Sequence, residues 1–265
     1  MGFSTIGYLL EFVLDRERVP SFSEYPFSLN ALANFRSLEF HPKVTFFVGE
    51  NGSGKSTLLE AIAYAVGLNP EGGTRNTVFS TADTHSKLFE YTRLIRSHKY
   101  PKDSYFLRAE SFYNLASYMD DGRQEYLWTY GGKSLHEQSH GESFFALFMN
   151  RLYSNGLYFL DEPEAALSPA RQLSFLSRLH QLVEDGAQFL IATHSPILMA
   201  YPQATIHLMA DGPPRRIAYR QPAAPSMRRC QAMFGLARVK NHCLLSRSIL
   251  LCSCARLFLM VDAGS

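Results

Sequence analysis

The amino-acid sequence predicts an α/β fold with a mainly parallel sheet that is flanked by helices. The first observation is a set of continuous apolar runs, typical of strands buried on both faces of a sheet, at 44–48, 157–160 and 188–192. The second is a helical spacing of apolar residues in the segments between or after these runs, at 56–66, 141–152 and 170–184. Strands that alternate with helices are joined by crossovers, which place the strands parallel in one sheet.

The N-terminal part of the chain departs from this pattern. Apolar and polar residues alternate at 8–14 and, less regularly, at 35–40, with turn-forming residues between the two segments. We therefore expect an antiparallel β portion before the first buried strand.

A third region interrupts the α/β pattern after the first helix. Residues 69–87 are rich in Gly, Thr, Ser and Asn, and helical patterns follow near 88–97 and 110–120. These features predict a partly helical insertion over roughly 69–138, inside a head domain that spans residues 1–210.

The composition limits the class of protein. With 265 residues, 46% of them hydrophobic, the chain can bury a substantial core, and a net charge of +2 does not favour a strongly basic DNA clamp. All four cysteines lie in 223–265, so the first 222 residues cannot contain a disulfide, which favours the reducing cytoplasm. The start of the chain does not have the pattern of a signal peptide, and Arg247 and Arg256 interrupt the apolar stretch 244–261, so we expect no transmembrane segment.

The C-terminal part, 211–265, is predicted to be an atypical tail. It begins with proline-containing segments, and residues 223–265 hold six basic residues and one acidic residue. An altered reading frame is the explanation we favour for this composition, and a basic amphipathic helix that binds a partner or a membrane surface is the alternative.

A glycine-rich loop between the strand 44–48 and the helix 56–66 carries the clearest chemical signal. Its sequence, Gly-Glu-Asn-Gly-Ser-Gly-Lys-Ser, fits the spacing G-x-x-x-x-G-K-[ST] of phosphate-binding loops. In such a loop the backbone N–H groups surround the phosphates, Lys55 reaches the β and γ oxygens, and Ser56 can ligate Mg²⁺. The residues expected to contact the nucleotide are Gly49, Glu50, Asn51, Gly52, Ser53, Gly54, Lys55, Ser56 and Thr57.

Acidic residues and a histidine follow the other two predicted strands. Asp161 and Glu162 end the run 157–160, where Asp161 can hold Mg²⁺ and Glu162 can act as the general base for an attacking water. His194 follows the run 188–192 and is expected to contact the γ-phosphate and orient the water.

These sites, with Ser139–Glu142 and Ala165–Ser168, resemble the ATP-binding-cassette ATPase superfamily in both residues and order. The resemblance covers roughly residues 8–210 and identifies a Walker A loop, a signature, a Walker B strand, a D-loop and a switch histidine. Details such as Glu142 and Asn34-Phe-Arg-Ser37 are similar to the SMC- and RecF-like branch. The interval between Lys55 and Ser139 is too short for coiled-coil arms, so the chain looks like a small stand-alone AAA-type ATPase of bacteria.

The resemblance implies Mg²⁺-dependent binding and hydrolysis of ATP by a homodimer that sandwiches the nucleotide. In this arrangement Ser139 and Gly141 of one subunit cap the γ-phosphate bound by Lys55 of the other, while Glu162 and His194 act in catalysis. The alternatives are an ATP-binding subunit of a transporter and a non-hydrolysing nucleotide switch. The resemblance leaves open whether an effector protein or a nucleic acid is the partner.

The sequence departs from the family pattern at several positions. His140 replaces a signature glycine, and Ser168 stands where an aspartate is common. Glu110, two residues after Arg108, is the candidate to replace the missing glutamine ligand of Mg²⁺. Tyr25 and Phe35 are candidates to stack on adenine, although core packing is the expected role of both.

Overall fold

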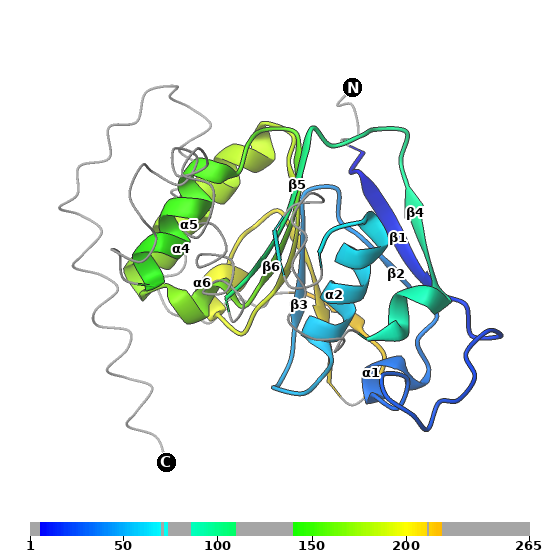
Figure 1. Cartoon of the computed structure of the whole chain (residues 1–265). Helices are drawn as coiled ribbons and strands as arrows, with labels where there is room; N and C mark the ends of the chain where they lie inside the picture. The colour runs from blue at the N-terminus through cyan, green and yellow to red at the C-terminus, as the bar shows by residue number, and fades with distance from the viewer. Residues whose placement is uncertain (1–5, 70–71, 74–85, 110–139, 211, 219–265) are drawn as a thin grey trace, which may run out of the picture.

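A computed structural model describes residues 6–69, 72–73, 86–109, 140–210 and 212–218 of the chain, and these residues form two sheets (Figure 1). The larger sheet has six strands in the order β5-β6-β7-β3-β8-β9. Its strands are β3 (Val44–Val48), β5 (Asp103–Arg108), β6 (Gly156–Asp161), β7 (Gln188–Ala192), β8 (Ala204–Leu208) and β9 (Arg215–Ile217). All neighbouring pairs are parallel except β8 and β9, so the predicted mainly parallel sheet is confirmed.

The second sheet is antiparallel and has three strands. Its order is β2-β1-β4, with β1 at Leu9–Leu14, β2 at Ser37–Glu39 and β4 at Thr92–Arg96. The predicted N-terminal antiparallel portion is therefore confirmed, although one of its three strands comes from much later in the chain.

Helices cover both faces of the larger sheet. In Figure 1, α4 (His140–Arg151) and α5 (Pro169–Glu184) lie on one side of it, and α2 (Lys55–Val66) lies on the other side, next to the antiparallel sheet. The remaining helical elements are short: α1 (Asn30–Ala33), η1 (Lys87–Tyr91), η4 (Pro163–Ala166) and α6 (Pro196–Met199).

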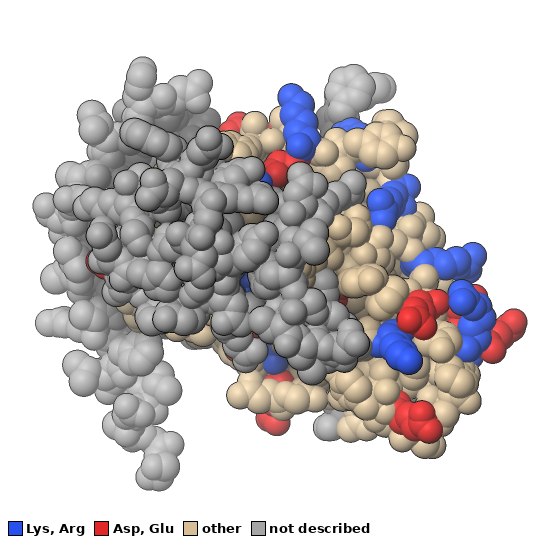
Figure 2. Space-filling view, in the orientation of Figure 1, with Lys and Arg blue, Asp and Glu red and all other residues tan. Residues whose placement is uncertain are grey.

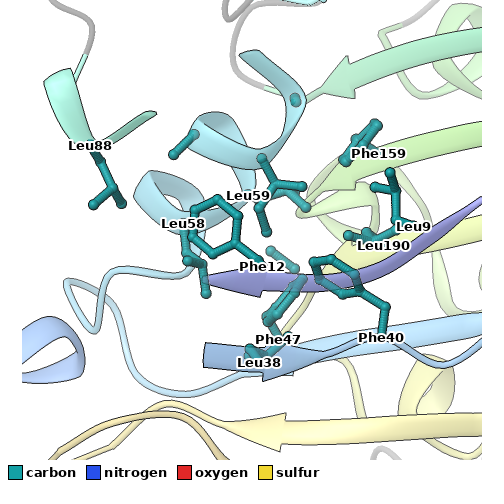
Figure 3. Close-up of a cluster of buried hydrophobic side chains, with 14 of the residues drawn as sticks. Leu9, Phe12, Leu38, Phe40, Phe47, Leu58, Leu59, Leu88, Phe159 and Leu190 are labelled. Carbon is teal, nitrogen blue, oxygen red and sulfur yellow. The ribbon is translucent and has the colours of Figure 1, made fainter. Parts of the chain in front are cut away.

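The strands of the larger sheet contribute alternate side chains to two hydrophobic clusters. Phe46 of β3 faces α4 and α5, whereas its neighbour Phe47 faces α2 and the antiparallel sheet. Figure 3 shows the second cluster, in which Phe12 of β1 and Leu59 of α2 gather with Phe47. Both faces of the strands are buried, which explains why their sequences are apolar throughout rather than alternating.

Gln188 joins the two sheets through hydrogen bonds. Its side chain is fully buried, and Oε1 accepts from the N–H groups of Tyr8 (2.8 Å) and Leu9 (2.9 Å). The amide nitrogen donates to the carbonyl oxygens of Leu9 (2.9 Å) and His41 (3.0 Å). One side chain at the start of β7 therefore holds the beginning of β1 against the larger sheet.

The structure corrects the helical prediction for 88–97. Residues 87–91 form one short 3-10 helix, and 92–96 form the strand β4. Residues 97–109 of the predicted insertion are also described, and Asp103–Arg108 form the strand β5 of the larger sheet. Residues 74–85 and 110–138, which include the predicted helical segment 110–120, lie outside the described residues.

The larger sheet also continues past residue 210, where the sequence predicted the head to end. The strand β9 pairs with β8, with Ile217 opposite Ile206. Residues 219–265, which make up most of the predicted tail, lie outside the described residues.

Charged side chains of both signs lie on the described part of the surface. In Figure 2, Lys and Arg side chains lie along the right-hand side of the visible face, with Asp and Glu side chains among them lower down. The edge strand β4 contributes the exposed Arg93 and Arg96. Charged side chains are typical of exposed edge strands, because they discourage pairing with another chain.

Candidate nucleotide-binding and catalytic site

The phosphate-binding loop connects β3 to α2 at the centre of the larger sheet, and two of its glycines are required by geometry. Gly54 has φ +92° and ψ +12° and immediately precedes the first residue of α2. This left-handed conformation is disfavoured for residues that have a Cβ atom. A Cβ atom on Gly49 would lie 2.0 Å from the carbonyl oxygen of Met209, so this position has no room for a side chain.

Lys55, the first residue of α2, points back into this loop. Its side chain is buried, and Nζ donates hydrogen bonds to the carbonyl oxygens of Gly49 (3.0 Å) and Glu50 (2.9 Å). Burial lowers the pKa of Lys55, against an opposing effect of three nearby carboxylates, those of Glu162, Asp161 and Glu164. The ammonium group is thus held where the loop and the acidic residues meet.

The loop also contains a buried hydroxyl group that is free to accept a ligand contact. Ser53 Oγ is buried and has no hydrogen-bond partner among the described residues. A buried polar atom of this kind is normally satisfied by a partner or a ligand.

Ser56 and Asp161, the two residues expected to hold Mg²⁺, are in direct contact. Ser56 Oγ donates a hydrogen bond of 3.0 Å to Asp161 Oδ1, at the carboxyl end of β6. A hydroxyl and a carboxylate are the hard oxygen ligands that Mg²⁺ prefers, and one or two such protein ligands suffice when phosphate oxygens complete the shell. Within the described ranges no group of three or more His, Cys, Asp or Glu residues could hold a metal by itself.

Arg108 supplies positive charge beside this pair. It ends β5 opposite Asp161, and its Nε lies 3.5 Å from Asp161 Oδ2. Its NH1 donates to Glu60 Oε2 of α2 at 2.9 Å. The aspartate that is buried at the sheet edge therefore has a cationic neighbour in addition to the serine hydroxyl.

Glu162 and His194 meet at the same edge of the sheet. His194 Nε2 lies 3.0 Å from Glu162 Oε1, and both side chains are 35% exposed. Glu162 has φ +48° and ψ +52°, a left-handed conformation that is uncommon for residues other than glycine. Unfavourable backbone conformations of this kind cluster at functional sites, where the surrounding structure enforces them.

Glu164 is a site residue for which the sequence offered no role. Its Oε1 accepts hydrogen bonds from Thr193 Oγ1 (2.7 Å), the backbone N–H of Ser195 (3.1 Å) and the backbone N–H of His194. The residue stands in the Asp-Glu-Pro-Glu sequence after β6, but nothing in that sequence indicates that the second glutamate reaches the loop after β7.

The structure places only part of the predicted signature. Gly141 lies in the first turn of α4, whereas Ser139 and the candidate magnesium ligand Glu110 lie outside the described residues. Glu142 is exposed and pairs with Arg171 of α5 at 3.3 Å.

The D-loop position Ser168 has a structural role in this chain. Its Oγ accepts a hydrogen bond from the N–H of Arg171 at 3.4 Å, so it caps the N-terminus of α5.

The two candidate adenine-stacking residues differ in exposure. Phe35 is buried in the core, as expected. Tyr25 is 64% exposed, so the expectation of core packing is wrong for this residue. Its hydroxyl lies 3.3 Å from Thr57 Oγ1, beside the residues that end the phosphate-binding loop.

Two models of AAA domains match consecutive parts of the chain. The first, an AAA domain, matches residues 27–129, and the second, described as an AAA domain, putative AbiEii toxin, Type IV TA system, matches residues 134–200. Together they contain the phosphate-binding loop, Asp161, Glu162 and His194 in the order described above. Over these two ranges the chain therefore resembles AAA-type P-loop ATPases. Its mainly parallel sheet with flanking helices and an antiparallel N-terminal sheet is a P-loop NTPase fold.

Individual relatives match over a short stretch or at low sequence identity. A stretch of 36 residues is 56% identical to the DNA replication and repair protein RecF of Colwellia psychrerythraea, a match that spans 10% of that protein and 12% of this chain. The SMC head domain from Thermotoga maritima is 16% identical with a TM-score of 0.43, covering 81% of this chain and all of that one. The ADP conformation of MJ1267, an ATP-binding cassette of an ABC transporter, is 17% identical with a TM-score of 0.44, covering 85% of this chain and 98% of that one.

No helix in the described part of the chain is long and apolar enough to cross a bilayer.

Proposed function

We propose that this P-loop ATPase binds ATP together with Mg²⁺ and hydrolyses it. The observation that carries the proposal is the pairing of Glu162 with His194 at the sheet edge where Lys55 and the Ser56–Asp161 pair also lie. A protein that only bound nucleotide would have no need of a second carboxylate beside the Walker B aspartate, held in a disfavoured backbone conformation.

Each residue of the site has a separate role in phosphoryl transfer to water. The N–H groups of the loop 49–56 and Lys55 bind and orient the β- and γ-phosphates. Ser56 and Asp161 would hold Mg²⁺, which supplies charge neutralisation on the phosphate oxygens when bound. Glu162 accepts the proton of the attacking water. His194 contacts Glu162 Oε1 and positions this carboxylate relative to the γ-phosphate.

We further propose that hydrolysis takes place in a head-to-tail homodimer. Gly141 lies in the first turn of α4, and the amide groups at a helix N-terminus favour an anionic ligand. With Ser139, this turn of one subunit would cap the γ-phosphate bound by Lys55 of the other. We propose that the protein acts in the cytoplasm. Its first 222 residues lack cysteine, so this part of the chain forms no disulfide and does not depend on an oxidising compartment.

Two substitutions test the assignment. Lys55→Ala should weaken ATP binding by at least about tenfold, because a charge-assisted hydrogen bond to phosphate contributes about 1.5–3 kcal/mol. Glu162→Gln should retain ATP binding but lower kcat by about 10²- to 10⁴-fold, because the amide cannot accept the proton of water. ATP affinity is measured by calorimetry and turnover by phosphate release, with size-exclusion chromatography to detect a dimer trapped by ATP.

The matched control is Glu17→Gln, the same chemical change at an exposed position far from the site in sequence. Wild-type affinity in Lys55→Ala would contradict the phosphate-binding role of the loop. Full turnover in Glu162→Gln would remove this residue from the role of general base.

A further inference from the structure

The turn that carries Glu162 is hydrogen-bonded to the strand end from which the His194 loop begins. Glu162 is followed by the short helix η4, and the N–H of Glu162 donates to the carbonyl oxygen of Ala192, the last residue of β7, at 3.0 Å. The turn after β6 and the loop after β7 therefore run side by side from the point where both strands end.

Three donors from the His194 loop converge on one oxygen atom of Glu164. They are the hydroxyl of Thr193 and the backbone N–H groups of His194 and Ser195, and all three donate to Oε1. The other oxygen, Oε2, is buried and has no hydrogen-bond partner among the described residues. A single carboxylate oxygen thus holds the side chain of Thr193 and the backbone N–H groups of His194 and Ser195.

The same turn also fixes the other end of His194. While Glu164 accepts from its backbone N–H, the ring nitrogen Nε2 lies 3.0 Å from Glu162 Oε1. The two glutamates are held in one short turn, so a displacement of the loop relative to Glu164 changes the distance from the ring to Glu162.

A second polar link reinforces this arrangement from α5. Ser195 Oγ donates to Gln172 Oε1 at 2.6 Å, and Gln172 Nε2 donates to the carbonyl oxygen of Leu167 at 3.0 Å. Both Ser195 and Gln172 are buried, so water cannot readily replace these bonds. The link anchors the loop but does not contact His194 itself.

We propose that Glu164 is a positioning residue for catalysis: it holds the Thr193 side chain and the backbone of His194 and Ser195 so that the His194 ring meets Glu162. The proposal rests on the proposed function, because it concerns the same reaction, but Glu164 itself accepts no proton and touches no substrate. A misplacement of about 1 Å in a catalytic group can lower a rate by about 100-fold, so a residue that only orients the loop can have a large effect on kcat.

The geometry predicts different outcomes for different replacements of Glu164. In Glu164→Ala the Thr193 hydroxyl and the His194 N–H lose their acceptor, while the Ser195 N–H keeps its bond to Thr193 Oγ1 at 3.0 Å. We expect kcat to fall by about 10- to 100-fold while the affinity for ATP stays within about threefold of wild type. Glu164→Gln keeps a carbonyl oxygen in the place of Oε1 and should retain most of kcat. Glu164→Asp keeps the charge but withdraws the carboxylate by one methylene group, so it should lose activity as the alanine variant does.

The contrast with Glu162 makes the test specific. Glutamine is expected to lower kcat by about 10²- to 10⁴-fold at position 162 and to be tolerated at position 164, two residues away in the same turn. Because Glu164 acts through His194, Glu164→Ala should add little to the loss caused by His194→Ala in the double variant.

The experiment measures kcat, ATP affinity and amide hydrogen exchange on the full chain, with Glu17→Ala as a control at an exposed site. Faster exchange at the amide of His194 in Glu164→Ala, but not in Glu164→Gln, together with the loss of kcat, would support the proposal. Wild-type kcat in both Glu164→Ala and Glu164→Asp, or unchanged exchange at the His194 amide, would overturn it. If Glu164→Ala does not fold, the aspartate variant decides.

Failure of the proposed function has a different signature. If the wild-type protein with ATP and Mg²⁺ releases no phosphate, the hydrolytic function and the positioning role both fall. If the wild type is active and Glu162→Gln is not, the proposed function stands whatever Glu164→Ala does.

Discussion

Replacement of Gln188 by leucine should destabilise the protein strongly, because this one side chain joins the two sheets. The amide makes four hydrogen bonds to backbone groups at the start of β1 and before β3, and leucine of similar volume makes none. A buried intramolecular hydrogen bond contributes about 0.5–1.5 kcal/mol, and a buried donor left without a partner costs about 1–3 kcal/mol. Since Gln188 is fully buried, we expect the free energy of unfolding to fall by about 3–5 kcal/mol.

The assay is urea denaturation followed by circular dichroism, with the thermal midpoint as a second measurement. For a chain of this size a loss of 4 kcal/mol corresponds to a decrease in Tm of about 8–16 °C. Gln181→Leu is the matched control, because Gln181 is exposed on α5. If the two variants differ by less than about 1 kcal/mol at an unchanged m-value, the hydrogen bonds of Gln188 do not hold the sheets together.

Two further predictions concern pH and the C-terminal region. Burial lowers the pKa of His207, with an opposing effect of its hydrogen bond to the Glu39 carbonyl oxygen and a further lowering by Arg216. The unfolded chain therefore binds a proton that the folded chain excludes, so the free energy of unfolding should decrease between about pH 7.5 and about pH 5.5. His207→Phe should reduce that decrease in denaturation series at the two pH values, and an unchanged slope would show that other groups cause it. Truncation after Gln221 should leave the thermal transition and the ATPase activity intact, because the described sheet ends at Ile217 and the assigned site residues precede His207. Loss of either property at equal protein concentration would show that residues beyond 221 contribute to the core or to a dimer interface.

The central elements of the fold could be predicted because their sequences carry a local signal. The strands 44–48 and 188–192 have the predicted bounds, since apolar side chains are needed on both faces of a buried parallel strand. The helix α2 begins and ends close to the predicted residues because Gly54 and Gly67 flank it, both with φ +92°.

The strand β4 could not be predicted because its pairing is long-range and its surface is mixed. Arg93 and Ile95 are exposed and Leu94 is only half-buried, so the segment lacks a clear period of two. Its partner β1 lies far away in the sequence. The strand β9 is similar, since a three-residue run of Arg-Arg-Ile has no β signal before β8 is in place.

The candidate site likewise contains residues that the sequence could predict and a residue that it could not. Motif spacing pointed to Lys55, Ser56, Asp161, Glu162 and His194, and the structure brings Ser56 to Asp161 and Glu162 to His194. Each of these residues belongs to a pattern of fixed spacing next to a strand or helix end, so the fold needs only to be regular for them to meet. The acceptor for the His194 backbone belongs to no such pattern.

Glu162 and Glu164 show why motif spacing alone cannot identify every residue of the site. Both are glutamates of the same Asp-Glu-Pro-Glu sequence. Neither the residue type nor the hydrophobic periodicity shows which of them has which role. The backbone does: the left-handed conformation of Glu162 directs its side chain to a partly exposed position beside His194, and the short helix that follows turns one oxygen of Glu164 into a buried position. A carboxylate that takes a proton from water needs access to water, whereas one that orders a loop needs donors and burial. The turn therefore gives each glutamate the surroundings that its proposed role requires.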